Sequence, residues 1–255
     1  MEALYKRNTL IKSISLMALM AAINCIFALL TNFVPFLGVV LVIFLPLTSA
    51  LVEVLCKDRY FPIYAFATIG LSIVVSLSAF DVTIFYVIPS ILTGYIFGLM
   101  SKKQLPVFLC IFVSSLLQTG VSFAFIPLIK LLTQRNLIND IQTLFRIENE
   151  LMFKNFLILG FFVVSIMQTI LSFIVVNNEM KKMKLNIELK NIDIFWCSLS
   201  GLLSSILLLI FSFISIQISY FCLGFAWFFG IFLIIYQFKF KKKILLILTA
   251  IFLFL

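Results

Sequence analysis

Few residues in this chain are of the types that carry catalysis, and the missing types exclude most mechanisms. The sequence has no histidine, which excludes Ser-His nucleophilic catalysis, HExxH zinc proteolysis and a histidine proton relay. It has no GxxxxGK(S/T) loop to bind a nucleotide phosphate. The cysteines are scattered without a CxxC pair and are interpreted as small packing residues: Cys25, Cys56, Cys110, Cys197 and Cys222. We therefore expect no enzyme activity, no cofactor and no metal site.

Acidic and amide side chains are the remaining candidates for chemistry within the apolar stretches. Glu53 and Asp81 are expected near opposite faces of a membrane, too far apart to form a catalytic pair. Glu53 stands four residues before Lys57, a spacing that predicts an ion pair on one helix face. The amides in or at the end of apolar stretches are Asn24, Gln118, Gln168 and Gln217. Such amides more often join helices than bind a substrate.

The composition explains why polar residues are so few. Of the 255 residues, 64% are hydrophobic and 11% are charged, whereas soluble domains carry about 25% charged residues. Apolar stretches of about 20 residues, each closed by a polar cluster, are typical of membrane-spanning helices. We place them near residues 13–34, 36–56, 60–80, 84–100, 105–130, 155–177, 194–217, 219–238 and 244–255. The first is too long for the apolar region of a signal peptide.

These stretches predict an all-α fold, namely a polytopic transmembrane helical bundle of about 8–9 spans. We expect residues 1–255 to form a single integral membrane domain. Within it we expect a five-span part over 1–130, an outer amphipathic helix over 131–154, and further spans over 155–255. Because the last apolar stretch is short, whether 244–255 forms a complete span is left open.

The basic residues predict the orientation of the chain. With a cytoplasmic N-terminus, every Lys and Arg falls on the inner side except Lys130, Arg135, Arg146 and Lys154. This distribution obeys the positive-inside rule and indicates a multi-pass membrane protein. The basic residues expected on the inner side of the membrane account for the net charge of +9. We expect the lipid bilayer as a partner and do not expect nucleic acid.

Two connections between apolar stretches are long. The outer one, 131–154, has apolar residues at roughly helical spacing and a polar opposite face, which predicts an amphipathic helix at the outer surface. A helical linker is the simpler interpretation, and a lid over a cavity is the functional alternative. The inner one, 177–193, carries lysines that either attract anionic lipids or only satisfy the topology.

The first apolar stretch, KSISLMALMAAINCIFALL, carries a stripe of small side chains at helical spacing. The stripe consists of Ser15, Ala18, Ala22 and Cys25. Lipid tails solvate large apolar side chains as well as a neighbouring helix does, so small residues that let two backbones approach favour helix association. We predict a close helix contact at Ala18 and Ala22, either within this chain or with another subunit.

The N-terminal half resembles the substrate-binding S components of energy-coupling-factor transporters. The similarity lies in the basic N-terminus, the AxxxA pattern of Ala18 and Ala22, and the outer turn FVPFLG, within a general layout shared by residues 1–130. A standard S component has six spans. The resemblance implies that the small-residue face of the first helix meets a transmembrane coupling subunit.

The C-terminal half is similar to a second group of proteins. A basic linker that follows a long span and closes on Phe195 and Trp196 resembles the YybS-like family of bacterial membrane proteins. Members of that family are longer than simple S components and have an S-component-like front half. This chain differs from the family pattern because its linker lacks a Pro-rich stretch.

Together these features predict a non-catalytic membrane subunit that binds a substrate or assists transport and needs partner proteins. The alternative is a structural or assembly protein that holds other envelope proteins by helix contacts, and a membrane-embedded enzyme is a distant third. If a small molecule binds, we expect it near the outer face, at Asn32, Asp81, Tyr86 and Gln118. The alternative for Asp81 is a span-ending residue in water.

Overall fold

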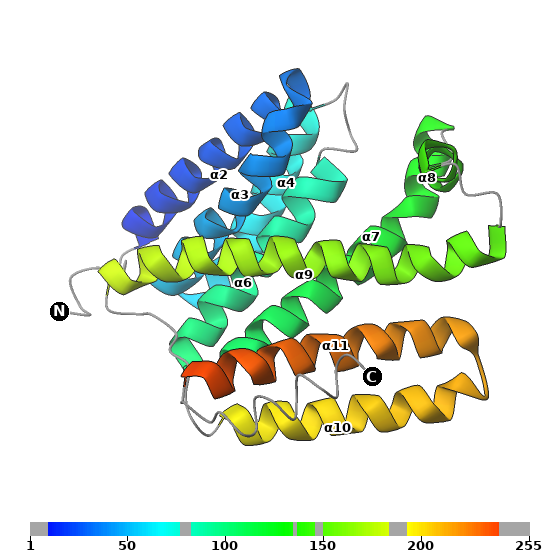
Figure 1. The fold of residues 1–255 in the computed structure, drawn as a ribbon. Helices are drawn as coiled ribbons and strands as arrows, with labels where there is room; N and C mark the ends of the chain where they lie inside the picture. The colour runs from blue at the N-terminus through cyan, green and yellow to red at the C-terminus, as the bar shows by residue number, and fades with distance from the viewer. Residues whose placement is uncertain (1–9, 77–82, 135–136, 146–149, 184–192, 240–255) are drawn as a thin grey trace. The chain divides into compact units, whose positions relative to one another are not determined.

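The computed structural model describes residues 10–76, 83–134, 137–145, 150–183 and 193–239, and these residues contain helices and no β-strand (Figure 1). The α-helices are α2 (Leu10–Phe33), α3 (Pro35–Leu55), α4 (Phe61–Val75), α6 (Ile88–Lys103), α7 (Val107–Thr133), α8 (Leu137–Phe145), α9 (Glu150–Lys182), α10 (Asp193–Ser212) and α11 (Ile216–Lys239). A 3-10 turn, η1 (Asp58–Tyr60), precedes α4, and a π-helical turn, η3 (Thr83–Val87), leads into α6. The prediction of an all-α fold is confirmed for the described residues.

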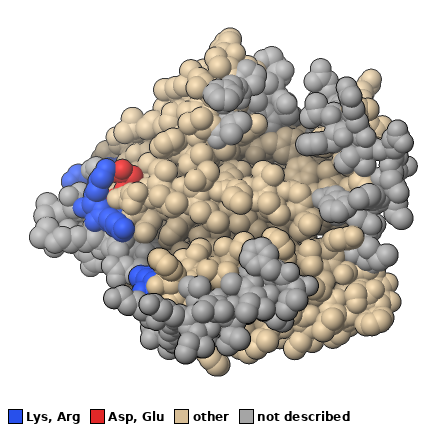
Figure 2. Space-filling view, viewed as in Figure 1, with Lys and Arg blue, Asp and Glu red and all other residues tan. Residues whose placement is uncertain are grey.

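Six of these helices are long and apolar enough to cross a membrane. They are Leu10–Phe33, Thr83–Lys103, Val107–Leu131, Leu157–Lys182, Asp193–Ser212 and Ile218–Lys239, and Val40–Leu55 is a shorter apolar helix. On the face shown in Figure 2, the described surface is mostly uncharged, as expected for helices that face lipid. The count of eight or nine spans stays a prediction, and the stretch 244–255 lies outside the described residues.

Prolines and a left-handed residue set several of the helix ends. Pro35 and Pro89 stand in the first turns of α3 and α6, where a missing backbone N–H costs nothing. At the other end of α6, Gln104 adopts a left-handed backbone with φ 52°, and its N–H caps the carbonyls of Met100 and Ser101. Helix α6 therefore ends directly after its lysine pair.

The chain divides into two compact units. Unit 1 comprises residues 1–105, 113–137 and 165–187, and unit 2 comprises 106–112, 138–164 and 188–255. Helices α7 and α9 each contribute to both units. The predicted division of one membrane domain into 1–130, 131–154 and 155–255 stays a prediction.

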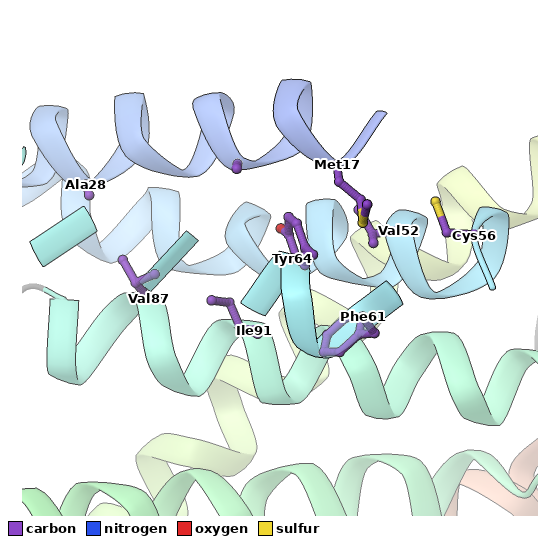
Figure 3. Packing of buried hydrophobic residues seen from close by; sticks show 9 residues of the cluster. Met17, Ala28, Val52, Cys56, Phe61, Tyr64, Val87 and Ile91 are labelled. Carbon is purple, nitrogen blue, oxygen red and sulfur yellow. The ribbon is translucent and has the colours of Figure 1, made fainter. Parts of the chain in front are cut away.

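Unit 1 is held together by a hydrophobic cluster between α2, α3, α4, η3 and α6 (Figure 3). Its buried members are Met17, Ala21, Ala28, Val52, Cys56, Phe61, Tyr64, Val87 and Ile91. The aromatic rings of Phe61 and Tyr95 stack at a centroid distance of 4.6 Å beside it. The cluster fixes the first helices of the chain around α6.

Helices α3 and α6 approach unusually closely because α6 carries glycines at positions 94 and 98. A Cβ atom on Gly94 would lie 2.3 Å from the backbone oxygen of Pro46, and one on Gly98 would lie 2.7 Å from the Cβ of Glu53. This spacing is the small-xxx-small pattern of closely packed membrane helices. The close packing in unit 1 is therefore at Gly94 and Gly98.

Unit 2 has a core of a different kind, built mainly from phenylalanine rings. The ring of Phe112 lies within 6.4 Å, between centroids, of Phe162, Phe225, Phe228 and Phe229. Helices α10 and α11 form a hairpin beside these rings, and Gly224 on α11 admits the rim of Phe162. Such edge-to-face and tilted ring contacts are favourable geometries for aromatic pairs and pack the interior of unit 2 tightly.

The predicted outer helix over 131–154 is shorter in the structure. Thr133 is the last residue of α7, α8 covers Leu137–Phe145, and α9 already begins at Glu150. The apolar positions of α8 recur at helical spacing, as the amphipathic pattern predicted. Its location at the outer surface stays a prediction.

Candidate functional site

Polar side chains buried at membrane depth are the features of this fold that could serve a function. Among the described residues, all buried polar side chains except Asp193, Ser204 and Gln237 belong to unit 1. Those of unit 1 lie on α2, α3, α4 and its C-cap Ser76, η3, α6, α7 and α9. Polar groups in an apolar medium cost free energy unless they are paired, so each group needs an account of its partners.

The most complete arrangement, the Asn24 network, joins α2, α3 and α4 through Asn24, Thr48, Ser49 and Tyr64. The Asn24 side-chain amide donates to the Tyr64 hydroxyl at 2.9 Å. The Thr48 hydroxyl lies 2.9 Å from Asn24 Oδ1 and 3.3 Å from the Tyr64 oxygen. The Ser49 hydroxyl lies 3.3 Å from the same Tyr64 oxygen. All four side chains are buried.

The network satisfies both ends of the Asn24 amide, so it acts as a structural joint. Its position follows from the helices: Asn24 lies on the buried face of α2, with Ala21 and Ala28, and Tyr64 lies on the buried face of α4. Interhelical hydrogen bonds of this kind stabilise membrane bundles by about 0.6–2 kcal/mol each. The network therefore joins three helices through side chains that already pair with one another.

We predict that Tyr64→Phe lowers the melting temperature of the purified chain, equivalent to about 1–2 kcal/mol. The substitution removes only the hydroxyl and leaves the Asn24 amide buried without its acceptor. Tyr60→Phe is the matched control because the Tyr60 hydroxyl accepts from the exposed neighbour Arg59. Equal melting temperatures for the two variants would contradict a structural role for the network.

A second arrangement, the Lys102 bridge, joins α3, η1 and α6 through Glu53, Asp58 and Lys102. The Lys102 ammonium lies 2.9 Å from Glu53 Oε1 and also contacts Asp58. The Glu53 side chain is fully buried, whereas that of Asp58 is 69% exposed. The second oxygen of Glu53 has no hydrogen-bond partner among the described residues. One lysine therefore pairs with both a buried carboxylate and an exposed one.

The predicted ion pair between Glu53 and Lys57 is wrong, because Glu53 pairs with Lys102. The helix ends too early for the predicted spacing to apply. Helix α3 stops at Leu55, and Cys56 has an extended backbone, so Lys57 does not lie on the face of Glu53. Gly98 lets α6 pass directly against Glu53 and brings Lys102 to it.

The four residues predicted to bind a small molecule lie in different surroundings. Asn32 is half-buried near the end of α2, and Tyr86 is half-buried in η3, beside the hydrophobic cluster. Asp81 lies outside the described residues. Gln118 is buried on α7, where its amide donates to Gln168 on α9. A binding role for these residues stays a prediction.

The predicted small-residue stripe of α2 faces outward. Ser15, Ala18 and Ala22 are exposed, and Cys25 is half-buried, with its sulfur 3.9 Å from the Ser72 hydroxyl. The buried face of α2 is the neighbouring one, formed by Ser13, Met17, Ala21, Asn24, Ala28 and Thr31. The stripe is thus available to a helix of another protein or to lipid.

The sequence did not indicate which residues pair with Asn24. Thr48, Ser49 and Tyr64 are types that occur at many positions in membrane helices, so no spacing marks them. The glycine pair at 94 and 98 carried a readable GxxxG pattern that indicates close packing. Lys102 carried no signal because its partner is distant in the sequence.

The apolar helices of the described residues define the chain as a helical, multi-pass integral membrane protein, in which most of the buried polar side chains belong to unit 1 and phenylalanine rings pack unit 2. Comparisons with protein-family models, curated proteins and solved structures found no match. Any function more specific than membrane integration therefore depends on the side chains themselves.

Proposed function

We propose that the chain is a non-catalytic, substrate-binding or transport-associated membrane subunit that works with partner proteins in a bacterial cell membrane. The observation that carries the proposal is the concentration of buried polar side chains in unit 1. Hydrogen bonds between helices account for some of these groups, but Ser114, Gln118 and Ser172 keep buried polar atoms without a partner among the described residues, which costs free energy unless a ligand pairs with them.

The layout of unit 1 supports the proposed resemblance to S components and to the YybS-like family. The described part of this unit draws on six helices, α2, α3, α4, α6, α7 and α9, and a standard S component has six spans. The exposed stripe with Ala18 and Ala22 supports the proposal that this face of α2 meets a transmembrane coupling subunit.

The proposed function can be tested by mild purification of the full chain from its native membrane, followed by mass spectrometry. A small molecule that stays bound at near-stoichiometric amount supports the substrate-binding subunit. Envelope proteins that co-purify with no bound small molecule would instead support a structural or assembly role. If the purified chain carried neither a small molecule nor a partner protein, that result would contradict both proposals.

The proposed orientation places the N-terminus in the cytoplasm. We expect reporter tags inserted after Arg59, within 177–193 and near Lys242 to be cytoplasmic, and a tag within 135–150 to be outside, because the lysine-rich ends lie on the inner side. Labelling of each tag by a membrane-impermeant reagent measures its side. A cytoplasmic signal from the tag within 135–150 would show that the order of spans is different.

We predict that Ala18→Leu and Ala22→Leu break a partner contact without unfolding the chain. Both side chains are exposed, so the added bulk meets no other part of the described structure. The variants should keep the wild-type melting temperature in isolation and lose any co-purified membrane partner. Ala21→Leu is the control: Ala21 is 4% exposed, so overpacking should lower the melting temperature by the equivalent of about 1–3 kcal/mol. Unchanged association in both outward variants would mean that the stripe faces lipid.

A further inference from the structure

Helices α7 and α9 are joined within unit 1 by hydrogen bonds between small polar side chains. The hydroxyls of Ser115 and Thr169 lie 3.0 Å apart, and those of Thr119 and Ser165 lie 3.1 Å apart. A step of four residues forward on α7 is thus matched by four residues backward on α9. The two helices therefore run antiparallel along this contact, which fixes which residues face each other.

Three polar atoms in this contact have no hydrogen-bond partner among the described residues. They are Oε1 of Gln118 and the hydroxyl oxygens of Ser114 and Ser172. Gln118 is 6% exposed and the two serines are fully buried. The Gln118 amide nitrogen is already used, because it donates to Gln168.

The antiparallel register places these three atoms in one neighbourhood. Ser114 lies one helical turn before Gln118 on α7, and Ser172 lies one turn after Gln168 on α9. Because the helices run in opposite directions, both serines lie in the same direction from the Gln118–Gln168 pair. We name Ser114, Gln118, Gln168 and Ser172 the glutamine cluster.

The unpartnered atoms are not a general feature of serines and threonines in these helices. Thr119 and Ser122, on the same face of α7, donate to carbonyls one turn back at 2.8 and 3.0 Å. Each buried polar group left without a partner costs about 1–3 kcal/mol. Three such groups at one place on two helices indicate that something other than the chain satisfies them.

The chemistry of the cluster defines what it can bind. The free position on Gln118 is a carbonyl oxygen, which needs a donor, and the two hydroxyls can either donate or accept. The charged residues described on these two helix segments lie near the helix ends: Lys130 on α7, and Glu179, Lys181 and Lys182 on α9. An ion at the cluster would lose its hydration without an opposite charge beside it. A neutral molecule that carries O–H or N–H donors fits.

We propose that the glutamine cluster binds a neutral solute through a hydroxyl or amide group of that solute. This inference rests on the proposed substrate-binding function and deepens it by giving the site and the chemical class. Gln118 Oε1 accepts from the solute, and Ser114 and Ser172 hydrogen-bond to its remaining polar atoms. Gln168 is a positioning residue, because it holds the Gln118 amide so that Oε1 stays open.

The first test uses stability in the absence of any added solute. Ser114→Ala and Ser172→Ala remove hydroxyls that the chain leaves unsatisfied, so the melting temperature should stay equal to or rise above that of the wild type. Ser122→Ala is the matched control, since it removes a hydroxyl with a partner, and its melting temperature should fall. A fall in the two cluster variants as large as in the control would overturn the proposal, because these hydroxyls would then be structural.

The second test uses small probes of defined chemistry on the full chain in lipid nanodiscs. Saturation-transfer NMR with glycerol and N-methylacetamide should give signals that are lost in a Ser114→Ala/Gln118→Leu/Ser172→Ala variant and kept in Ser122→Ala. Tetramethylammonium and acetate should give the same signal in every variant. Neutral-probe signals that persist in the triple variant would overturn the site. The absence of neutral-probe signals from the wild type would overturn it too, since water alone would then occupy the cluster.

The two proposals fail in different ways in one further comparison. A compound that co-purifies equally with the wild type and with the triple variant would overturn the glutamine cluster and leave the proposed function standing at another site. The absence of any compound from all variants would count against substrate binding altogether. A neutral compound lost only from the triple variant would support both.

Discussion

Lys102→Met is expected to destabilise the chain by about 3 kcal/mol, near the lower end of what breaking a buried ion pair costs because Lys102 is partly exposed. The substitution leaves the carboxylate of Glu53 fully buried in α3 without a countercharge. One of its oxygens already has no hydrogen-bond partner among the described residues. Thermal unfolding of the purified chain, followed by circular dichroism, measures the effect.

The double variant Glu53→Gln/Lys102→Met shows whether the loss of stability comes from the unpaired carboxylate or from removal of the lysine side chain itself. Removing both charges removes the unpaired carboxylate, so the double variant should recover most of the stability lost in Lys102→Met. Lys103→Met is the matched control, because Lys103 is exposed and no described ion pair includes it. If the double variant were as unstable as the single one, the ion pair would not be the cause.

The spans of this protein can be predicted from the sequence, whereas the buried face of a span cannot. A stretch such as residues 13–34 is long and apolar, and these two properties suffice to indicate a membrane helix. Both faces of α2 carry small residues beside large apolar ones, and lipid is as apolar as a helix neighbour, so only the polar side chains of Ser13, Asn24 and Thr31 distinguish the inward face. The outward stripe with Ala18 and Ala22 is displaced by one residue from the buried face with Ala21. The spacing of apolar residues alone therefore does not show which of the two faces is buried.

The candidate sites show a related limit, because their partners are distant in the sequence. Local spacing suggested Lys57 for Glu53, but the carboxylate meets Lys102, 49 residues away. Gln118 could be named as a polar residue at membrane depth, but its contact with Gln168 on α9 follows only from the packing of the helices. A single sequence without homologues contains the polar residues but not the pairs they form.

Replacing Gly94 with alanine is expected to disrupt the packing of α3 against α6. The new methyl group would lie 2.3 Å from the backbone oxygen of Pro46 and 2.6 Å from the Cβ of Ser49, and backbone atoms cannot move aside as a flexible side chain can. Overpacking of this kind costs about 1–3 kcal/mol. Because Ser49 and Thr48 on α3 belong to the Asn24 network, the shift should also lengthen the hydrogen bonds to Tyr64. Lower melting temperature and faster amide exchange in α3 are the expected readouts.

Two other glycines separate this steric effect from the general preference of helices for alanine. Gly70 on α4 and Gly120 on α7 have no heavy atom within 4 Å of an added Cβ, so alanine at either position should leave stability unchanged or raise it by about 0.5–1 kcal/mol. Gly98→Ala should resemble Gly94→Ala, because its methyl group would meet Glu53 at 2.7 Å. Gly98→Ala should also disturb the Lys102 bridge, because Gly98 contacts Glu53 and Gly94 does not. A neutral result for Gly94→Ala, with gains at Gly70 and Gly120, would mean that α3 and α6 are not in close contact, and the account of unit 1 around that contact would be wrong.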